Sequence, residues 1–167
     1  WRVSNTFEGS ITLPDLYRKV SPNYNGRATV PVLWDDYQHT IVNNESADII
    51  QILNSQFNPF AKNFNLDLYP VELREECDRW NKIIYKTVNN GVYRCGFAQS
   101  QTSYENACDD LFKALDIIES QLKETSYLCG SKLTLADARL FPTLIRFDTV
   151  YHHLFRCNRK RIYDYPN

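Results

Sequence analysis

Two short segments hold residue types that suit the recognition of a small peptide. Pro31 interrupts the apolar run 30–34, and a proline cannot donate to a sheet ladder, so it belongs at an edge or at the start of a strand. If the peptide bond between Val30 and Pro31 is cis, the N–H and C=O of Val30 point away from the sheet. Another extended chain can then pair with them. The alternative is an edge proline that only prevents aggregation.

A polar cluster follows, where a helix is expected to begin. The first turn of a helix presents free N–H groups and a partial positive charge, so Ser46 can bind a carboxylate through its hydroxyl and amide. Glu45 beside it can hold an ammonium group. Together with the Val30 backbone, the two residues suit a peptide with a free α-amino acid end, such as glutathione. The alternative for Glu45 and Ser46 is ordinary helix capping.

The pattern of apolar residues divides the chain into an α/β segment and a helical one. Residues 1–58 are expected to hold a hairpin and a helix, and residues 59–69 form a linker. Residues 70–167 are expected to be helical, because their apolar residues recur at intervals of three and four. The predicted elements are strands at 29–34 and 39–42 and helices at 46–57, 70–87, 102–124 and from 135 onward.

Two of these helices carry the signature of a capping box. In such a box an N-cap hydroxyl and a carboxylate three residues later each accept the other residue's backbone N–H. Thr102 with Glu105 is expected to begin one helix, and Thr134 with Asp137 begins the next. Farther along the last helix, Arg146 and Asp148 are expected to form a paired or capped interior network.

Composition argues against several classes of function. The chain has 167 residues, 43% of them hydrophobic, and a net charge of −1, so neither nucleic acid nor a membrane is an expected partner. The five cysteines show no CxxC or metal-finger spacing, which indicates no metal site and a reducing compartment: the cytoplasm, or an organelle stroma or matrix. The chain lacks methionine and begins with Trp1, so we expect a fragment cut at both ends.

Five segments in combination carry a family resemblance. They are TVPVLWD at 29–35, TIVNNES at 40–46, TVNNGVY at 87–93, GFA at 96–98 and RFDTVY at 146–151. Together they resemble the glutathionyl-hydroquinone reductases, which are xi-class, omega-like glutathione transferases. The resemblance implies an α+β to all-α fold, in which a partial thioredoxin-like α/β domain is followed by a truncated helical domain. It also implies a homodimer when the protein is intact.

The same resemblance implies a reaction. These enzymes reduce glutathionyl-hydroquinones to hydroquinones with glutathione as co-substrate. The thiolate of a Cys-Pro-Trp-Ala motif attacks the glutathionyl sulfur, and a second glutathione resolves the mixed disulfide. This chain contains no such motif, so the nucleophile is expected before Trp1. The alternatives are an omega-type transferase or dehydroascorbate reductase, and a non-catalytic glutathione-binding module.

The resemblance also implies roles for single residues. The residues expected to contact glutathione are Trp1, Val30, Pro31, Glu45 and Ser46. Tyr93 and Tyr151 are expected to be catalytic, because a phenol ring can stack on a quinol ring and its hydroxyl can donate to a developing phenolate. Cys95 lies close to Tyr93 in sequence, but in the helical half, and it is not expected to replace the missing nucleophile.

Overall fold

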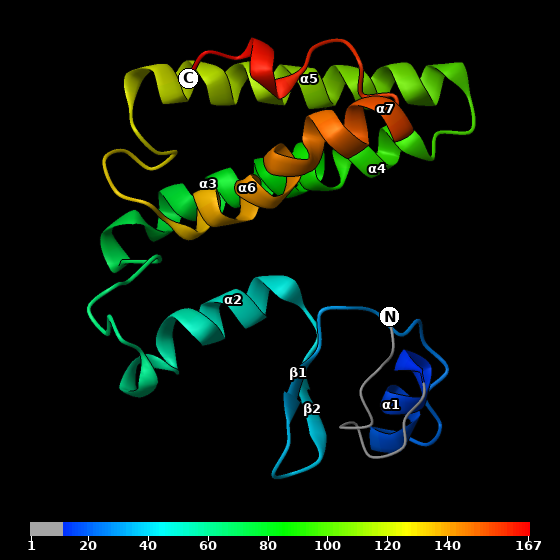
Figure 1. The fold of residues 1–167 in the computed structure, drawn as a ribbon, viewed down its shortest axis with the longest axis vertical. Coiled ribbons are helices and arrows are strands. Elements are labelled where there is room, and N and C mark those ends of the chain that lie inside the picture. The colour runs from blue at the N-terminus through cyan, green and yellow to red at the C-terminus, as the bar shows by residue number, and fades with distance from the viewer. Residues whose placement is uncertain (1–11) are drawn as a thin grey trace. The chain divides into compact units, whose positions relative to one another are not determined.

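The computed structural model describes residues 12–167 (Figure 1). Contacts divide the chain into two compact units, Trp1–Phe64 and Asn65–Asn167. Trp1, which was predicted to contact glutathione, lies outside the described residues.

The first unit contains a hairpin and two helices. In chain order its elements are α1 (Leu13–Val20), β1 (Leu33–Asp35), β2 (Thr40–Asn43), α2 (Ser46–Ser55) and the 3-10 turn η1 (Asn58–Phe60). The two strands pair antiparallel, with Trp34 opposite Ile41. In the turn between them, Asp35 Oδ1 accepts hydrogen bonds from the N–H groups of Tyr37 and Gln38, both at 2.9 Å. The predicted hairpin and helix are confirmed, although both strands and the helix differ from the predicted bounds by one to four residues.

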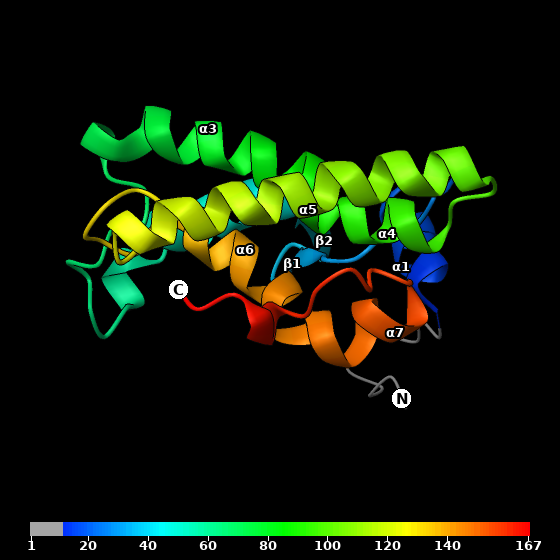
Figure 2. The ribbon, with the colours of Figure 1, turned by 90° about the horizontal axis from the view of Figure 1, so that it is seen from above.

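The second unit is helical, as predicted (Figure 2). Its elements are η2 (Val71–Leu73), α3 (Arg74–Ile84), η3 (Tyr85–Asn89), α4 (Gly91–Gly96), α5 (Gln101–Glu124), α6 (Leu135–Arg146), η4 (Phe147–Tyr151), α7 (His152–Leu154) and η5 (Ile162–Asp164). The long helix α5 packs along α4, and α3 packs against α6. The largest fully buried side chains of the core include Trp80, Ile84, Leu111, Leu128 and Phe147. The C-terminal segment returns along α5 (Figure 1), where the Tyr165 hydroxyl donates to Asp116.

Two π-helical segments interrupt what the sequence predicts as continuous α-helix. They are η3 and η4. In η3 the Asn90 N–H bonds the carbonyl of Tyr85 at 3.0 Å, five residues back. The wider turn places the following residues differently from an α-helix, and such insertions are frequent at functional sites. Tyr93 lies shortly after η3, and Tyr151 is the last residue of η4.

The predicted capping boxes have different outcomes. The box of Thr134 and Asp137 is confirmed, with the Thr134 N–H donating to Asp137 Oδ2 at 2.8 Å. The other prediction is wrong, because α5 begins at Gln101 and its N-cap is Ser100, whose Oγ accepts from the Ser103 N–H at 3.2 Å. Thr102 therefore lies inside the first turn, where it cannot act as the cap.

Candidate functional site

The backbone at Val30 has the form that the peptide-pairing interpretation requires. The Val30–Pro31 peptide bond is cis, and Val30 is 75% exposed. The segment lies just before β1 rather than within it. Among residues 12–167, no hydrogen bond uses the N–H or C=O of Val30. Both groups are thus available to an extended chain.

The start of α2 combines capping with free polar groups. Glu45 is the N-cap, and its Oε1 accepts from the Ala47 N–H at 3.3 Å, so the capping interpretation is confirmed for Glu45. The exposed hydroxyl of Ser46 donates to the same oxygen at 3.4 Å. Within the described part of the chain, the second oxygen of Glu45 has no hydrogen-bond partner. Capping therefore uses one carboxylate oxygen of Glu45 and leaves the other for a ligand.

Thr29 connects the two parts of this predicted site. Its side-chain oxygen accepts from Asn44 Nδ2 at 3.4 Å, and its carbonyl accepts from the buried hydroxyl of Tyr17 at 2.8 Å. The residue before Val30 is therefore held beside the residue before Glu45. One small ligand can meet the Val30 backbone and the start of α2 together.

In the helical unit, the two predicted tyrosines come together although 58 positions separate them. Their hydroxyl oxygens lie 3.3 Å apart, and their rings meet edge to face with centroids 5.8 Å apart. Tyr151 is 5% exposed and Tyr93 43%, so one phenol is anchored and the other faces solvent. A flat aromatic ligand can reach the ring and hydroxyl of Tyr93.

Two phenylalanines, Phe97 and Phe155, extend this aromatic cluster, and the sequence predicted no role for either of them. The Phe155 ring lies edge-on to Tyr93 and to Tyr151, with centroid distances of 5.3 and 5.4 Å. Phe97 stacks beside Tyr93 at 6.3 Å and is 71% exposed. The four-residue intervals from Tyr93 to Phe97 and from Tyr151 to Phe155 were a usable signal, since residues at that interval share a helix face.

Electrostatics keep Tyr93 protonated. Its hydrogen bond with Tyr151 raises the pKa of Tyr93, burial adds to the increase, and the positive charge of Arg146 opposes it. A neutral phenol at neutral pH is a hydrogen-bond donor, which is the form that stabilises a phenolate oxygen on a ligand.

Arg146 and Asp148 do not pair with each other among the described residues, but Asp148 does cap a turn. The Asp148 carboxylate accepts from the backbone N–H groups of Ile162 and Tyr163, at 2.7 and 3.2 Å. Arg146 is exposed at the end of α6. The predicted pairing is therefore wrong, whereas the capping alternative holds for Asp148, which caps the first turn of η5.

All five cysteines are buried. A hydrogen bond with Cys157, together with burial, raises the pKa of Cys95 far above its usual range. Burial likewise raises the pKa of Cys108 to about 11. Thiols in this state are poor nucleophiles, which supports the expectation that Cys95 does not replace the family's cysteine.

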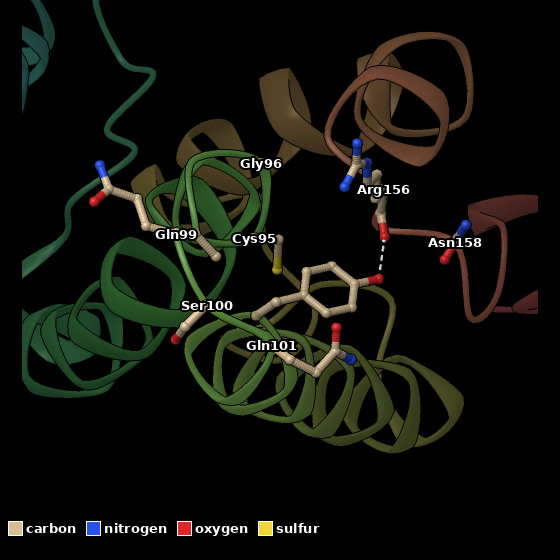
Figure 3. Close-up of a pocket in the computed structure, with 9 residues that line it drawn as sticks. Cys95, Gly96, Gln99, Ser100, Gln101, Arg156 and Asn158 are labelled. Atoms are coloured by element: carbon tan, nitrogen blue, oxygen red, sulfur yellow. Dashed lines mark hydrogen bonds between the residues drawn. The ribbon is translucent and has the colours of Figure 1, made fainter.

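A pocket of about 370 Å³ lies next to Cys95 at the start of α5 (Figure 3). Its lining is largely polar and includes Gln99, Gln101 and Asn158. The Tyr104 hydroxyl donates to the backbone carbonyl of Arg156 at 2.7 Å across it. The cysteine thiol in its wall is protonated, so the pocket offers binding surface rather than a nucleophile.

Comparison with known proteins identifies the family. The model of the glutathione S-transferase N-terminal domain matches residues 3–56, and that of the C-terminal domain matches residues 101–167. The chain belongs to the glutathione S-transferases. The first match contains the Val30 segment and the start of α2, and the second contains Tyr151.

Individual relatives of this transferase point to the xi class and confirm the resemblance. The chain is 49% identical to "Glutathionyl-hydroquinone reductase PcpF" of Sphingobium chlorophenolicum, over 99% of this chain and 52% of the relative. It superposes on the xi glutathione S-transferase of Phanerochaete chrysosporium with a TM-score of 0.94 at 47% identity, covering 100% of this chain and 60% of that one.

A third relative was solved with glutathione bound. The glutathione-bound structure of YqjG, from Escherichia coli K-12, matches with a TM-score of 0.90 at 48% identity, covering 93% of this chain and 50% of that one. The transferase chain thus spans about half the length of the curated relatives it matches. The fold predicted from the sequence, a thioredoxin-like domain followed by a helical domain, is confirmed by the two family models.

Within residues 12–167, no group of three or more His, Cys, Asp and Glu side chains has an arrangement that could hold a metal ion. None of the helices in the same range has the length and apolar character needed to cross a membrane.

The buried thiols predict a pH dependence for the stability of the transferase. Burial raises the pKa of Cys108 and of Cys129 from 9.0 to about 11. Between these values the unfolded chain loses thiol protons that the folded chain keeps. The stabilisation that these protonated thiols give the folded state is therefore fully present below pH 9. The free energy of unfolding is expected to fall as the pH rises from about 9 to about 11.

Urea denaturation at pH 8, 9 and 10, with a reducing agent present, measures this effect. Cys108→Ala is expected to make the decline shallower, because one of the buried thiols with a raised pKa no longer titrates. A decline above pH 9 that Cys108→Ala and Cys129→Ala leave unchanged would contradict the assignment to these thiols.

Proposed function

We propose that the intact protein reduces glutathionyl-hydroquinones to hydroquinones, with glutathione as co-substrate. The observation that carries the proposal is the phenol pair. The hydroxyls of Tyr93 and the buried Tyr151 lie 3.3 Å apart, and the ring of Phe155 contacts both. Such a pair suits an acceptor that is itself an aromatic diol. The name of the relative PcpF supports the same reaction.

The first unit is proposed to bind glutathione. The N–H and C=O of Val30 pair with the cysteinyl part of the tripeptide, in the manner of an added strand, with Pro31 shaping the segment. The hydroxyl and amide of Ser46 bind the γ-glutamyl carboxylate at the positive end of α2. The free oxygen of Glu45 accepts from the ammonium group. Trp1 is also proposed to contact glutathione.

The second unit is proposed to act on the acceptor. A cysteine thiolate from the upstream segment attacks the glutathionyl sulfur, so the bond between that sulfur and the quinol ring breaks and a mixed disulfide forms. Tyr93 donates to the oxygen on which negative charge develops, and the ring carbon is protonated as the hydroquinone leaves. The thiol of a second glutathione then releases the enzyme thiol and oxidised glutathione. Tyr151 orients Tyr93 through the hydroxyl contact.

The proposal extends to the oligomeric state and the cellular compartment of the intact protein. The intact protein is proposed to be a homodimer in the cytoplasm, or in an organelle stroma or matrix. A broader thiol transfer of the omega type is the second candidate. It is favoured by a relative 47% identical to this chain, "Glutathione S-transferase omega-like 2" of Schizosaccharomyces pombe. Release of hydroquinone distinguishes the two reactions.

Ser46→Ala is expected to weaken the binding of glutathione by about tenfold. The variant removes a hydroxyl proposed to donate to a carboxylate, and a hydrogen bond to a charged group contributes about 1.5–3 kcal/mol. Isothermal titration calorimetry of the protein with glutathione measures the dissociation constant.

Ser55→Ala is the matched control, because Ser55 ends the same helix and its hydroxyl donates only to the Gln51 carbonyl among the described contacts. Equal dissociation constants for wild type, Ser46→Ala and Ser55→Ala would remove Ser46 from the glutathione site.

A further inference from the structure

Three of the five buried cysteines come together in the core of the helical unit, although separate segments carry them. Cys95 is in the last turn of α4, Cys108 is in α5, and Cys157 follows α7. The Sγ atoms of Cys95 and Cys108 lie 3.5 Å apart, and a hydrogen bond links Cys95 to Cys157. The proposed reaction uses none of the three.

The two closest thiols are near the geometry of a disulfide. An S–S bond is about 2.05 Å long, so the sulfur atoms of Cys95 and Cys108 need to approach by about 1.5 Å. Helix α4 packs along α5, and only residues 97–100 connect the two helices. Cys157 is held differently, because its thiol donates to the backbone carbonyls of Val92 and Phe155, at 3.9 and 3.8 Å. The contact therefore favours Cys108 as the partner of Cys95.

The pocket next to Cys95 gives a small molecule access to this pair (Figure 3). Its volume is about 370 Å³, and its lining includes Cys95 and Tyr104. Cys95 is 3% exposed, whereas Cys108 is fully buried. A water molecule occupies about 30 Å³ in the liquid, and hydrogen peroxide is only slightly larger and is uncharged. A peroxide molecule therefore fits in the pocket and can reach the sulfur of Cys95 first.

We propose that Cys95 and Cys108 form a disulfide when a hydroperoxide enters this pocket. The thiolate of Cys95 attacks one oxygen of hydrogen peroxide, the O–O bond breaks, and a sulfenic acid and one water molecule form. The sulfur of Cys108 then attacks the sulfur of Cys95, and the sulfenic hydroxyl leaves as a second water molecule. Together the two thiols lose two protons and two electrons, which reduce the peroxide to water.

Both thiols are protonated at neutral pH, so this oxidation is expected to be slow. Burial raises the pKa of Cys108 to about 11, and the thiolate is the form that reacts. The site therefore responds to sustained exposure to peroxide, and in a reducing compartment the two cysteines remain thiols. The cysteines are 13 positions apart, so the bond restricts the unfolded chain and is expected to raise the melting temperature. It also joins α4, which carries Tyr93, covalently to α5.

The proposed reaction would generate such an oxidant near the site. Oxygen oxidises hydroquinones, the products of that reaction, to quinones, and the oxygen is itself reduced to hydrogen peroxide. Oxidation of the two cysteines, however, requires neither glutathione nor an acceptor. An experiment that adds peroxide directly therefore has an outcome that does not depend on the proposed reaction.

Peptide mapping by mass spectrometry, after prolonged exposure of the full-length protein to excess hydrogen peroxide, tests the proposal. Thiols that remain free are alkylated once the protein is denatured. The expected result is a pair of peptides joined through Cys95 and Cys108, which has lost two hydrogens and separates on reduction, while Cys77 and Cys129 are alkylated. Alkylation of both Cys95 and Cys108, or a bond from Cys95 to Cys157 in its place, would overturn the proposal.

Cysteine variants separate the two steps of the oxidation. In Cys157→Ala the disulfide is expected to form as in wild type. Adding Cys108→Ala to that variant leaves Cys95 without a second thiol beside it, so its sulfenic acid is expected to persist. Dimedone, which labels sulfenic acids, is then expected to label Cys95 several-fold more than in Cys157→Ala alone. Cys129→Ala is the matched control, because it removes another buried cysteine and is expected to leave the disulfide unchanged. Equal labelling with and without Cys108 would contradict the assignment.

The route of the peroxide is tested by widening the pocket. Tyr104→Ala removes a ring that lines the pocket, so the disulfide is expected to form several-fold faster than in wild type. Tyr163→Ala is the control, because Tyr163 is 90% exposed and lies outside the pocket lining. Equal rates of disulfide formation in Tyr104→Ala, Tyr163→Ala and wild type would contradict entry through this pocket.

Discussion

Gly96→Ala is expected to lower the free energy of unfolding by about 2 kcal/mol or more, as severe overpacking does. A Cβ atom at position 96 would lie 2.1 Å from Cδ1 of Phe155, 2.7 Å from its Cγ and 2.9 Å from its Cβ. Rotation of the ring cannot relieve the last contact, so the backbone of α4 or of the segment after α7 has to move.

The same substitution is expected to disturb the aromatic cluster. The ring of Phe155 lies edge-on to Tyr93 and to Tyr151. If Phe155 is displaced, the hydroxyl contact between the two tyrosines loses its support. Gly96→Ala in the full-length protein is therefore expected to slow the proposed reaction as well as to destabilise the fold.

Urea denaturation of two alanine variants measures the effect on stability. Gly91→Ala is the matched control, because it lies in the same helix and its Cβ would be 3.7 Å from the nearest atom, Leu111 Cδ1. That variant is expected to be neutral or to gain up to about 1 kcal/mol, since alanine favours a helix over glycine. Adding Phe155→Ala to Gly96→Ala tests the contact itself, because the loss caused by Gly96→Ala should then shrink. Equal stabilities for the two glycine variants would refute the predicted clash.

Tyr93→Phe is expected to slow hydroquinone release about 100-fold in the full-length protein, the effect typical of removing one donor to a developing oxyanion. Phenylalanine keeps the ring contacts with Phe97 and Phe155 and removes only the hydroxyl. If that hydroxyl acts mainly in the transition state, kcat falls while KM changes little.

Two further variants separate this role from packing. Tyr163→Phe is the control, because Tyr163 is 90% exposed and lies outside the aromatic cluster. Tyr151→Phe removes the partner hydroxyl and is expected to have a smaller effect than Tyr93→Phe, since Tyr151 acts through Tyr93. Steady-state rates with a glutathionyl-hydroquinone give both comparisons. An unchanged kcat in Tyr93→Phe would show that the Tyr93 hydroxyl does not act in the reaction and that the residue only packs.

Local sequence patterns predicted those features whose determinants are neighbours in the chain. The hairpin follows from apolar segments around Asp35, and the last capping box follows from the spacing of Thr134 and Asp137. Where several polar residues could each be the N-cap of a helix, their spacing alone did not identify the residue that caps it. The chosen cap of α5 is Ser100, although Thr102 offered the better pattern with Glu105.

Contacts between distant segments were not predictable in the same way. The partners of Asp148 are backbone groups 14 and 15 residues away. The packing of α3 against α6 likewise brings together Asn81 and Arg139, which are 58 positions apart in the sequence. No local pattern in the sequence predicted the π-helical form of η3 and η4. Tyr93 and Tyr151 were found because their motifs resemble a family, and the structure adds that their hydroxyls meet.

The proposed reaction requires this chain to supply the glutathione and acceptor contacts of a glutathionyl-hydroquinone reductase. The most direct measurement is a product analysis of the full-length protein with a glutathionyl-hydroquinone and glutathione. One hydroquinone and one oxidised glutathione are expected for each substrate consumed, with release slowed in Tyr93→Phe. Binding of glutathione without release of hydroquinone would contradict the claim.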